Sequence, residues 1–290
     1  MRKRLPPRIW VLLAKEARVA VVFRRGPSRQ VELIKWNLDD DSFEEGQSFK
    51  GRIYERRCGL SPNGQYLIYF AATYKPPLQS WTAISKPPYF TALMLWPKGD
   101  GWNGGGYFTG KKEVHLDHPL RQIHLHANFK LRAGLFRIGS RAQWRGEDGP
   151  VWHETLRRAG WKVVDAGKWN QPDLSRAYFV TAKRPETWTR QHPSRAMRLV
   201  MEIHGIGQDQ GAWYAVRYYV LSDADELINE LGFVDWAEWD DKGHLLFAGE
   251  GCIYRQSCAR TKFRSPQILV DLNDHKFKAV PPPPWALEVT

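Results

Sequence analysis

The sequence has little cysteine: Cys58, Cys252 and Cys258 are its three thiols in 290 residues, and none lies in a Cys-x-x-Cys pair. An odd, low number of scattered cysteines argues against a disulfide framework and against a zinc ribbon. Small buried positions in a reducing compartment are the simpler interpretation of such cysteines.

Long apolar runs are also missing. Residues 1–4 are basic, like the start of a signal peptide, but the apolar run at 9–14 is cut off by Lys15, Glu16 and Arg18. Such a run is too short for a secretory core, and no later stretch approaches the roughly 18 uncharged residues of a membrane span. These absences predict a soluble, cytoplasmic protein that makes no membrane contact.

Charge is plentiful but uneven. The chain carries 43 Lys and Arg against 31 Asp and Glu, a net charge of +12. Residues 221–250 hold nine acidic side chains and one basic one, Lys242, so this segment carries −8 and the rest of the chain carries +20. The asymmetry predicts either an acidic partner or pairing of the two regions within the chain.

Aromatic and turn-forming residues are abundant. The sequence has 14 Trp, 11 Tyr and 13 Phe, together with 24 Gly and 19 Pro. Aromatic side chains favour half-buried positions on sheets, and frequent Gly and Pro favour short strands with many turns. The composition therefore predicts an all-β protein.

One turn-and-strand unit recurs along the chain. Residues 61–64 (Ser-Pro-Asn-Gly) precede an apolar run at 66–71, and residues 240–243 (Asp-Asp-Lys-Gly) precede another at 245–248. The closing glycine of each turn supplies a positive φ angle. Two more divergent copies stand at 134–137 and 172–180, so the unit recurs at roughly 40–65 residues, which is typical of repeat architectures.

The two clearer copies resemble the SPDG-x-x-L-x-Y turn of WD40-like and TolB-like β-propeller repeats, although the Gly-His and Trp-Asp pairs of full WD40 repeats are missing. The resemblance implies a ring of four-stranded antiparallel sheets. At about 50 residues per blade the chain holds about five blades. We expect a single propeller domain over residues 1–290, and an irregular pair of β-sandwiches is the alternative. The expected blades and helical insertions have the following bounds: blades at 8–48, 49–98, 99–147, 160–221 and 232–280, and helices near 153–159 and 223–231.

Histidines suggest a metal site. His124 and His126 alternate with apolar residues, so on a strand they would share one face at a spacing that suits two metal ligands, with His118 or Asp117 as a third. The same alternation also predicts an ordinary amphipathic strand whose histidines face water. No other cofactor is indicated.

Three further patterns offer chemistry. The glycine-rich segment 99–106 lacks the Lys-Ser/Thr ending of a phosphate loop, which predicts a flexible hairpin loop with Trp102 at its tip. Five acids near strands or turns raise the possibility of a glycosidase, but no spacing marks a pair: Asp165, Asp173, Asp235, Glu238 and Asp240. Basic doublets and tryptophans could contact a phosphate backbone and bases: residues 24–25, 56–57, 157–158 and 183–184, with Trp169, Trp188 and Trp213.

No catalytic signature stands out, so the leading hypothesis is a non-enzymatic scaffold that binds a protein partner, plausibly an acidic one, through aromatic loops and a basic face. The alternatives are a nucleic-acid-associated accessory protein and a metal- or carboxylate-dependent hydrolase at the propeller centre. The expected partner-binding residues are aromatic or basic: Trp81, Tyr89, Phe90, Trp102, Arg157, Arg158, Lys183 and Arg184.

Overall fold

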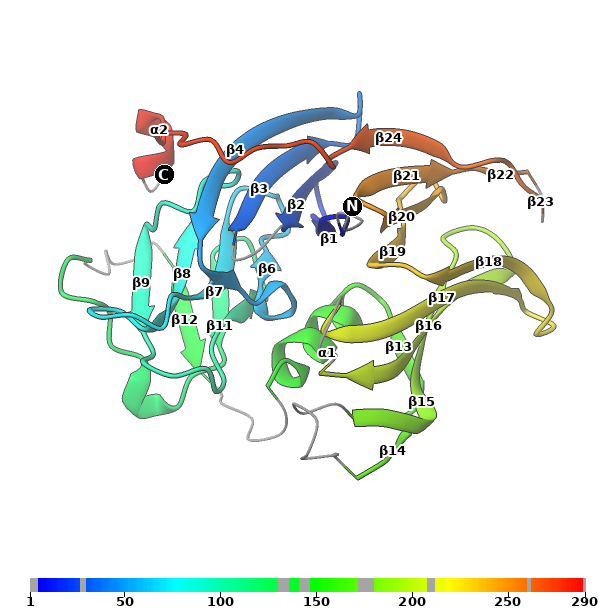
Figure 1. Cartoon of the computed structure of the whole chain (residues 1–290), viewed down its shortest axis with the longest axis horizontal. Helices are drawn as coiled ribbons and strands as arrows, with labels where there is room; N and C mark the ends of the chain where they lie inside the picture. The colour runs from blue at the N-terminus through cyan, green and yellow to red at the C-terminus, as the bar shows by residue number, and fades with distance from the viewer. Residues whose placement is uncertain are drawn as a thin grey trace. The chain divides into compact units, whose positions relative to one another are not determined.

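The computed structural model describes residues 5–26, 30–129, 136–140, 147–171, 180–207, 212–259 and 262–288. The chain divides into two compact units. Unit 1 comprises Met1–Ile9 and Arg157–Asp274, and unit 2 comprises Trp10–Leu156 and His275–Thr290. The fold is predominantly β, with mostly antiparallel sheets (Figure 1). No helix in the described ranges has the length and apolar character needed to cross a membrane.

The first sheet of unit 2 has four strands in the order β1-β2-β3-β4, with these bounds: β1 (Arg8–Leu13), β2 (Val19–Arg25), β3 (Gln30–Asn37) and β4 (Ser42–Lys50). Strands β1, β2 and β3 are rich in branched and aromatic residues and are largely buried, whereas the edge strand β4 is polar and mostly solvent-accessible. This contrast fits an edge strand.

The second sheet of unit 2 is built on β7, which pairs with β5 and β6 on one side and β8 on the other. Its strands are β5 (Arg52–Ile53), β6 (Gly59–Leu60), β7 (Leu67–Ala72), β8 (Ser80–Ser85) and β9 (Met94–Pro97). The short 3-10 helix η1 (Glu55–Arg57) lies between β5 and β6.

The third sheet has three strands, β10 (Gly106–Phe108), β11 (Glu113–Leu116) and β12 (Arg137–Ser140). Strands β11 and β12 run parallel, so the four-stranded antiparallel blade expected here is not what the described residues form. A shared core joins this sheet to the second one: Tyr66, Ile68, Ile84 and Trp96 pack with Phe108, Val114 and Leu116.

Unit 1 contains a six-stranded sheet formed by β13 (Lys162–Asp165), β14 (Lys168–Trp169), β15 (Val180–Gln191), β16 (Met197–Ile206), β17 (Tyr214–Ser222) and β18 (Leu227–Phe233). Along β17, buried and half-buried residues alternate, as expected when one face of a sheet covers the core.

The last large sheet of unit 1 has the order β19-β20-β21-β24, from β19 (Trp236–Trp239), β20 (Leu245–Gly249), β21 (Cys252–Gln256) and β24 (Gln267–Asp271). A separate two-stranded pair is formed by β22 (Cys258–Ala259) and β23 (Lys262–Phe263).

Both predicted turns form in the same way. Gly64 has a φ angle of 72° and donates its amide to the Ser61 carbonyl, and Gly243 has a φ angle of 78° and donates to the Asp240 carbonyl. The strands β7 and β20 follow directly. The divergent copy at 172–180 lies outside the described residues except for Val180, and Gly134 and Leu135 of the other lie outside them too.

One of the two expected helices is present. Helix α1 (Gly149–Arg158) covers most of the predicted segment near 153–159. The helix expected near 223–231 is wrong, because Ser222–Glu226 closes a β-hairpin. Asp225 adopts a φ angle of 64°, and the Ser222 amide donates to the Glu226 carbonyl. The following residues pair with β17 as strand β18, so a cross-strand partner outweighed the helix-capping pattern.

The strand expected around His124 and His126 is absent. After the 3-10 helix η2 (Leu120–Gln122), residues 123–126 adopt no regular secondary structure. The backbone amide of His126 donates to the Leu95 carbonyl instead. Ile123 and Leu125 still pack against the shared core, which accounts for the apolar alternation without a strand.

Candidate functional site

Arg57 holds the backbone of the glycine-rich segment 99–106 in place, and its own side chain is 0% exposed. Its guanidinium donates to the carbonyl oxygens of Gly101 at 2.8 Å and Asn103 at 2.7 Å, and to the Asp148 carboxylate at 2.5 Å. Sequence reasoning assigned Arg57 to a surface doublet and the loop to a flexible hairpin. Both assignments are wrong: the segment joins β9 to β10 of different sheets, and a buried charge fixes its backbone.

Two glycines allow the loop to lie this close. A Cβ atom on Gly104 would stand 2.4 Å from the Phe70 ring, and one on Gly105 would stand 2.1 Å from the Arg57 carbonyl oxygen. Both residues also have positive φ angles. The Gly105 amide donates to the Thr82 hydroxyl at 2.7 Å, so the loop is tied to β8 as well. Close approach of backbone, and not a phosphate, explains these glycines.

Trp102 stands out on this fixed loop, with 64% of its surface exposed. The Asp100 carboxylate accepts a hydrogen bond from the Trp102 amide at 2.9 Å and forms an ion pair with the Lys98 ammonium at 2.7 Å. Tyr74, which is also exposed, lies beside the same loop, since a Cβ atom on Gly101 would stand 3.1 Å from its hydroxyl. We call Tyr74 and Trp102, with the loop 99–105, the aromatic loop surface.

The aromatic loop surface rests on a layer of tyrosine and arginine. The Tyr74 hydroxyl hydrogen-bonds to that of Tyr54, and the Arg52 guanidinium stacks on the Tyr54 ring at 4.3 Å from its centroid. Burial raises the pKa of Tyr54, so this phenol stays neutral at physiological pH. Exposed Lys75 follows Tyr74, the Asp100 carboxylate pairs with Lys98, and Arg57 pairs with Asp148 and Glu147.

The other aromatic residues predicted to bind a partner are not brought to this surface. Trp81 lies on the face of β8 opposite to Thr82 and packs edge-on against Phe49 at 5.7 Å. Phe90 is buried and packs against Phe49, and Tyr89 is buried and packs against Trp285 of the same chain. The exposed-loop prediction for Tyr89 and Phe90 is therefore wrong, because both fill the interior of unit 2.

The basic residues predicted to bind a partner lie in unit 1. Arg157 is exposed at the end of α1, with its guanidinium 5.6 Å from the Trp188 ring centroid, and Arg158 is half-buried. Lys183 and Arg184 are exposed on β15, where Arg184 pairs with Asp165 at 2.9 Å. Trp188 is itself buried, which removes it from any exposed stacking surface.

The other two basic doublets are mostly turned inward. Arg56 is buried with its guanidinium 4.3 Å from the ring centroid of Trp10 and 4.7 Å from that of Trp152. Arg24 is buried beside Glu32 and donates to the Gly26 carbonyl at 2.7 Å. These guanidinium groups are used in packing, so the doublets do not form a continuous phosphate-binding face.

The predicted metal ligands do not converge. Buried His118 has both ring nitrogens engaged: Nε2 with the Thr82 hydroxyl at 2.7 Å and Nδ1 with the Gln122 carbonyl at 2.8 Å. Burial lowers the pKa of His118 to about 4, which keeps it neutral. His124 is exposed, and Nδ1 of His126 accepts from the Asn128 amide at 3.3 Å. Within the described residues, these histidines do not belong to any group of three potential metal ligands that lie close together.

The carboxylates considered for hydrolysis hold the fold of unit 1 together. Asp235 accepts from the Ile9 amide at 3.0 Å, and Asp240 from the His244 amide at 2.7 Å. Glu238 is buried and accepts from the Trp161 indole at 2.7 Å; burial raises its pKa. Asp165 accepts from the Gly167 amide at 2.7 Å, and Asp173 lies outside the described residues. None of the four described carboxylates is arranged as an acid–base pair.

Much of the acidic segment 221–250 pairs within unit 1. Glu230 forms two hydrogen bonds with Arg217, at 3.2 and 2.7 Å, and Asp225 pairs with Arg198. Glu238 pairs with Arg190 at 3.4 Å. Of the two interpretations offered by the charge asymmetry, these contacts favour intramolecular pairing.

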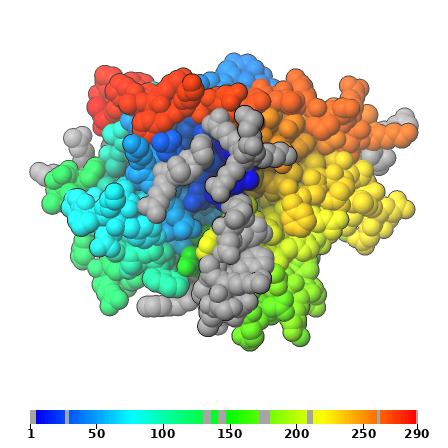
Figure 2. Space-filling model, in the orientation of Figure 1, coloured from blue at the N-terminus to red at the C-terminus, as the bar shows by residue number. Residues whose placement is uncertain are grey.

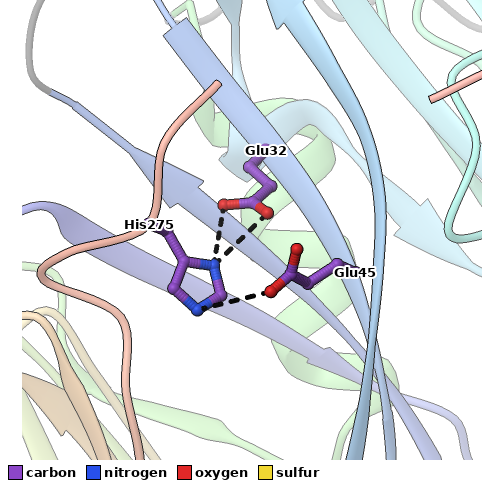
Figure 3. Close-up of side chains that lie close together, drawn as sticks. All are labelled: Glu32, Glu45 and His275. Carbon is purple, nitrogen blue, oxygen red and sulfur yellow. Dashed lines mark hydrogen bonds and ion pairs between the residues drawn. The ribbon is translucent and has the colours of Figure 1, made fainter. Parts of the chain in front are cut away.

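A different cluster was missed by sequence reasoning. Glu32, Glu45 and His275 converge in unit 2 from β3, β4 and the segment after β24, with ligand atoms within 4.8 Å of one another (Figure 3). His275 stands between the two carboxylates: Nδ1 is 3.2 Å from Glu32, and Nε2 is 3.8 Å from Glu45. A metal ion would bind one ring nitrogen, whereas here each ring nitrogen faces a different carboxylate, so His275 bridges the two acids. Glu32 and His275 are 243 positions apart in the sequence, so no local pattern could have signalled the cluster.

Comparisons with known proteins give no identification. No family model matches the chain, and no curated protein matches it. One solved structure with a weak likeness is hydrazine synthase of Kuenenia stuttgartiensis, at 10% identity and a TM-score of 0.31, covering 89% of this chain and 79% of that one. A likeness of this size carries no argument about function.

Proposed function

We propose that this chain is a non-catalytic binding module and that the aromatic loop surface, with Trp102 at its centre, contacts an acidic segment of a protein partner. The observation that carries the proposal is a large exposed indole on a loop whose backbone is fixed by the buried Arg57. Tryptophan is enriched among residues that dominate interface energies. A loop already held in one conformation loses little entropy on binding.

An exposed cation beside Tyr74 supports an acidic ligand. Lys75 is exposed next to Tyr74, and the Arg52 guanidinium stacks on the Tyr54 ring, while Asp100 pairs with Lys98 and Arg57 pairs with Asp148 and Glu147. A segment that places an apolar side chain on Trp102 and a carboxylate near Lys75 would match both features.

We infer further that the sheets spanning β1–β4, β5–β9, β10–β12, β13–β18 and β19–β24 are blades of one propeller. Their succession along the chain and the matching turns before β7 and β20 support this inference. Small-angle X-ray scattering tests it: a closed ring requires a compact profile, and two separately moving units would contradict it.

The binding proposal is tested by selecting peptides from a random displayed library on the full chain, with counter-selection on Trp102→Ala. We expect enriched peptides that combine Asp or Glu with an apolar anchor. Their affinity, measured by fluorescence anisotropy, should fall about 30-fold or more in Trp102→Ala, the size of an interface hot spot. It should also weaken as salt rises.

Leu120→Ala provides the matched control, because Leu120 is an exposed apolar side chain of unit 2 on η2. Its variant should bind the selected peptides as the natural chain does. If no enriched peptide distinguishes Trp102→Ala from Leu120→Ala, the aromatic loop surface is not a binding site.

A further inference from the structure

The segment after β24 returns along unit 2 without joining a sheet. Residues 275–283 belong to no helix or strand, and the segment then ends in the short helix α2 (Pro284–Leu287) (Figure 1). We call residues 275–287 the strap. It lies on the outside of the molecule, where Figure 2 shows it in red and orange-red. Side-chain contacts at its two ends hold it to unit 2.

The first end of the strap is held by acids. His275 is placed between Glu32 and Glu45 (Figure 3). Lys278 pairs with Glu45 at 2.6 Å. Glu32 is buried, and burial raises its pKa, an effect opposed by His275 and Arg24. A buried carboxylate favours a cationic neighbour, so this end of the surface selects positive side chains.

The second end is held by an aromatic contact and a lysine. The Trp285 indole packs edge-on against the Tyr89 ring at 5.4 Å. The Lys86 ammonium donates to the Trp285 carbonyl at 2.9 Å, and the next residue, Ala286, is fully buried. The Tyr89 ring thus contacts a side chain at the end of the strap, and the Lys86 ammonium contacts its backbone.

The two ends are joined by four prolines, 281–284. Pro283 has φ and ψ angles of −70° and 161°, which are those of a polyproline II helix. Such a segment has no internal hydrogen bonds and is extended before it binds, so docking it costs little conformational entropy.

We propose that the surface formed by Glu32, Glu45, Lys86 and Tyr89 is a recognition site for basic, proline-rich segments that end in tryptophan, and that the strap occupies it as a detachable internal ligand. Release of the strap opens the site to a segment of the same chemistry on a partner protein. This site is independent of the aromatic loop surface. Because the strap has no strand pairing to break, it can detach while the sheets of unit 2 stay folded.

The first test measures amide hydrogen exchange in the full chain and in Trp285→Ala, Glu45→Gln and Leu287→Ala. We expect the amides of residues 275–280 and 285–288 to exchange about tenfold faster in the first two variants, which lose an aromatic or ionic contact. Amides of β3, β7 and β8 should be unchanged. Leu287→Ala is the control, because Leu287 is exposed on the same short helix.

The second test adds a synthetic peptide with the sequence of residues 274–288 to each full-length variant and follows binding by calorimetry. Trp285→Ala should bind the peptide, whereas the natural chain and Leu287→Ala, whose straps stay docked, should bind it at least tenfold more weakly. Adding Lys86→Ala to Trp285→Ala should abolish binding. The proposal is overturned if the strap is equally protected in all variants, or if a released strap leaves a surface that does not bind the peptide.

Discussion

Replacing Arg57 tests whether one buried charge fixes the aromatic loop surface. In Arg57→Leu, the carbonyls of Gly101 and Asn103 lose charge-assisted hydrogen bonds, and buried Asp148 loses its guanidinium partner. Hydrogen bonds to a charged group are worth about 1.5–3 kcal/mol each, but they are not additive within one network. Breaking a buried ion pair from one side costs about 3–5 kcal/mol. We therefore expect a loss of about 3–5 kcal/mol in the free energy of unfolding, measured by urea denaturation.

A second variant separates the two roles of this arginine. In Arg57→Leu/Asp148→Asn, the stranded carboxylate is gone, so part of the lost stability should return, about 1–3 kcal/mol. The carbonyls of Gly101 and Asn103 remain without their donor, so amides of residues 99–105 should exchange rapidly in both variants. A stability loss below about 1 kcal/mol in Arg57→Leu, or loop amides as protected as in the natural chain, would refute this reasoning.

Two further perturbations probe the same region. His118 has a pKa of about 4, below its ordinary 6.5, so its neutral form contributes stability that is complete above pH 6.5 and is lost as pH falls towards 4. The free energy of unfolding lost in this way is about 3 kcal/mol. In His118→Gln, the change in unfolding free energy between neutral pH and pH 4 should be smaller by that amount. An unchanged pH dependence would contradict the buried neutral state of His118. Gly105→Ala should lower the free energy of unfolding by about 2 kcal/mol or more beyond the loss in Gly99→Ala. Both glycines have φ angles near 85°, but only Gly105 has a backbone atom 2.1 Å from an added Cβ. Equal shifts of the melting temperature in the two variants would contradict a steric role for Gly105.

The local signals in the sequence gave correct predictions where a short stretch of chain decides the structure. The turns at Gly64 and Gly243 form as predicted, because only glycine adopts the required φ angle at no cost. Strands β2, β20 and β21 begin where apolar residues begin, and β1 begins one residue before its apolar run. The helix predicted near 223–231 does not form, because the residues that could cap a helix there also fit a tight turn. Strand β17 also provides backbone partners for this segment, which no local pattern reveals. The metal-site prediction failed because the alternation around His124 reflects packing of Ile123 and Leu125 against a core shared with distant strands.

The candidate sites were harder to predict than the fold. Trp102 was correctly placed at an exposed loop tip, but nothing local indicated that Arg57 would hold that loop, since the two are far apart in sequence. Tyr89 was identified as an interface anchor, and it does contact a tryptophan, but that tryptophan is Trp285 of the same chain. The sequence indicates which side chains are of a type that often lies in interfaces. The tertiary fold decides whether such a side chain contacts another protein or another part of the same chain.

The arginines show why a positive net charge does not by itself define a basic face on this chain. A count of +12 suggested a basic face, yet Arg24, Arg56 and Arg57 are buried against carboxylates, carbonyls or tryptophan rings. Arginine tolerates burial because its planar guanidinium is weakly hydrated and can satisfy several acceptors while stacking on rings. A basic, aromatic-rich sequence can therefore use its cations to fix loops instead of binding an external polyanion. Two of the cations that stay exposed are Lys75, which follows Tyr74 on the surface proposed to bind an acidic segment, and Lys278, which pairs with Glu45 near the start of the strap.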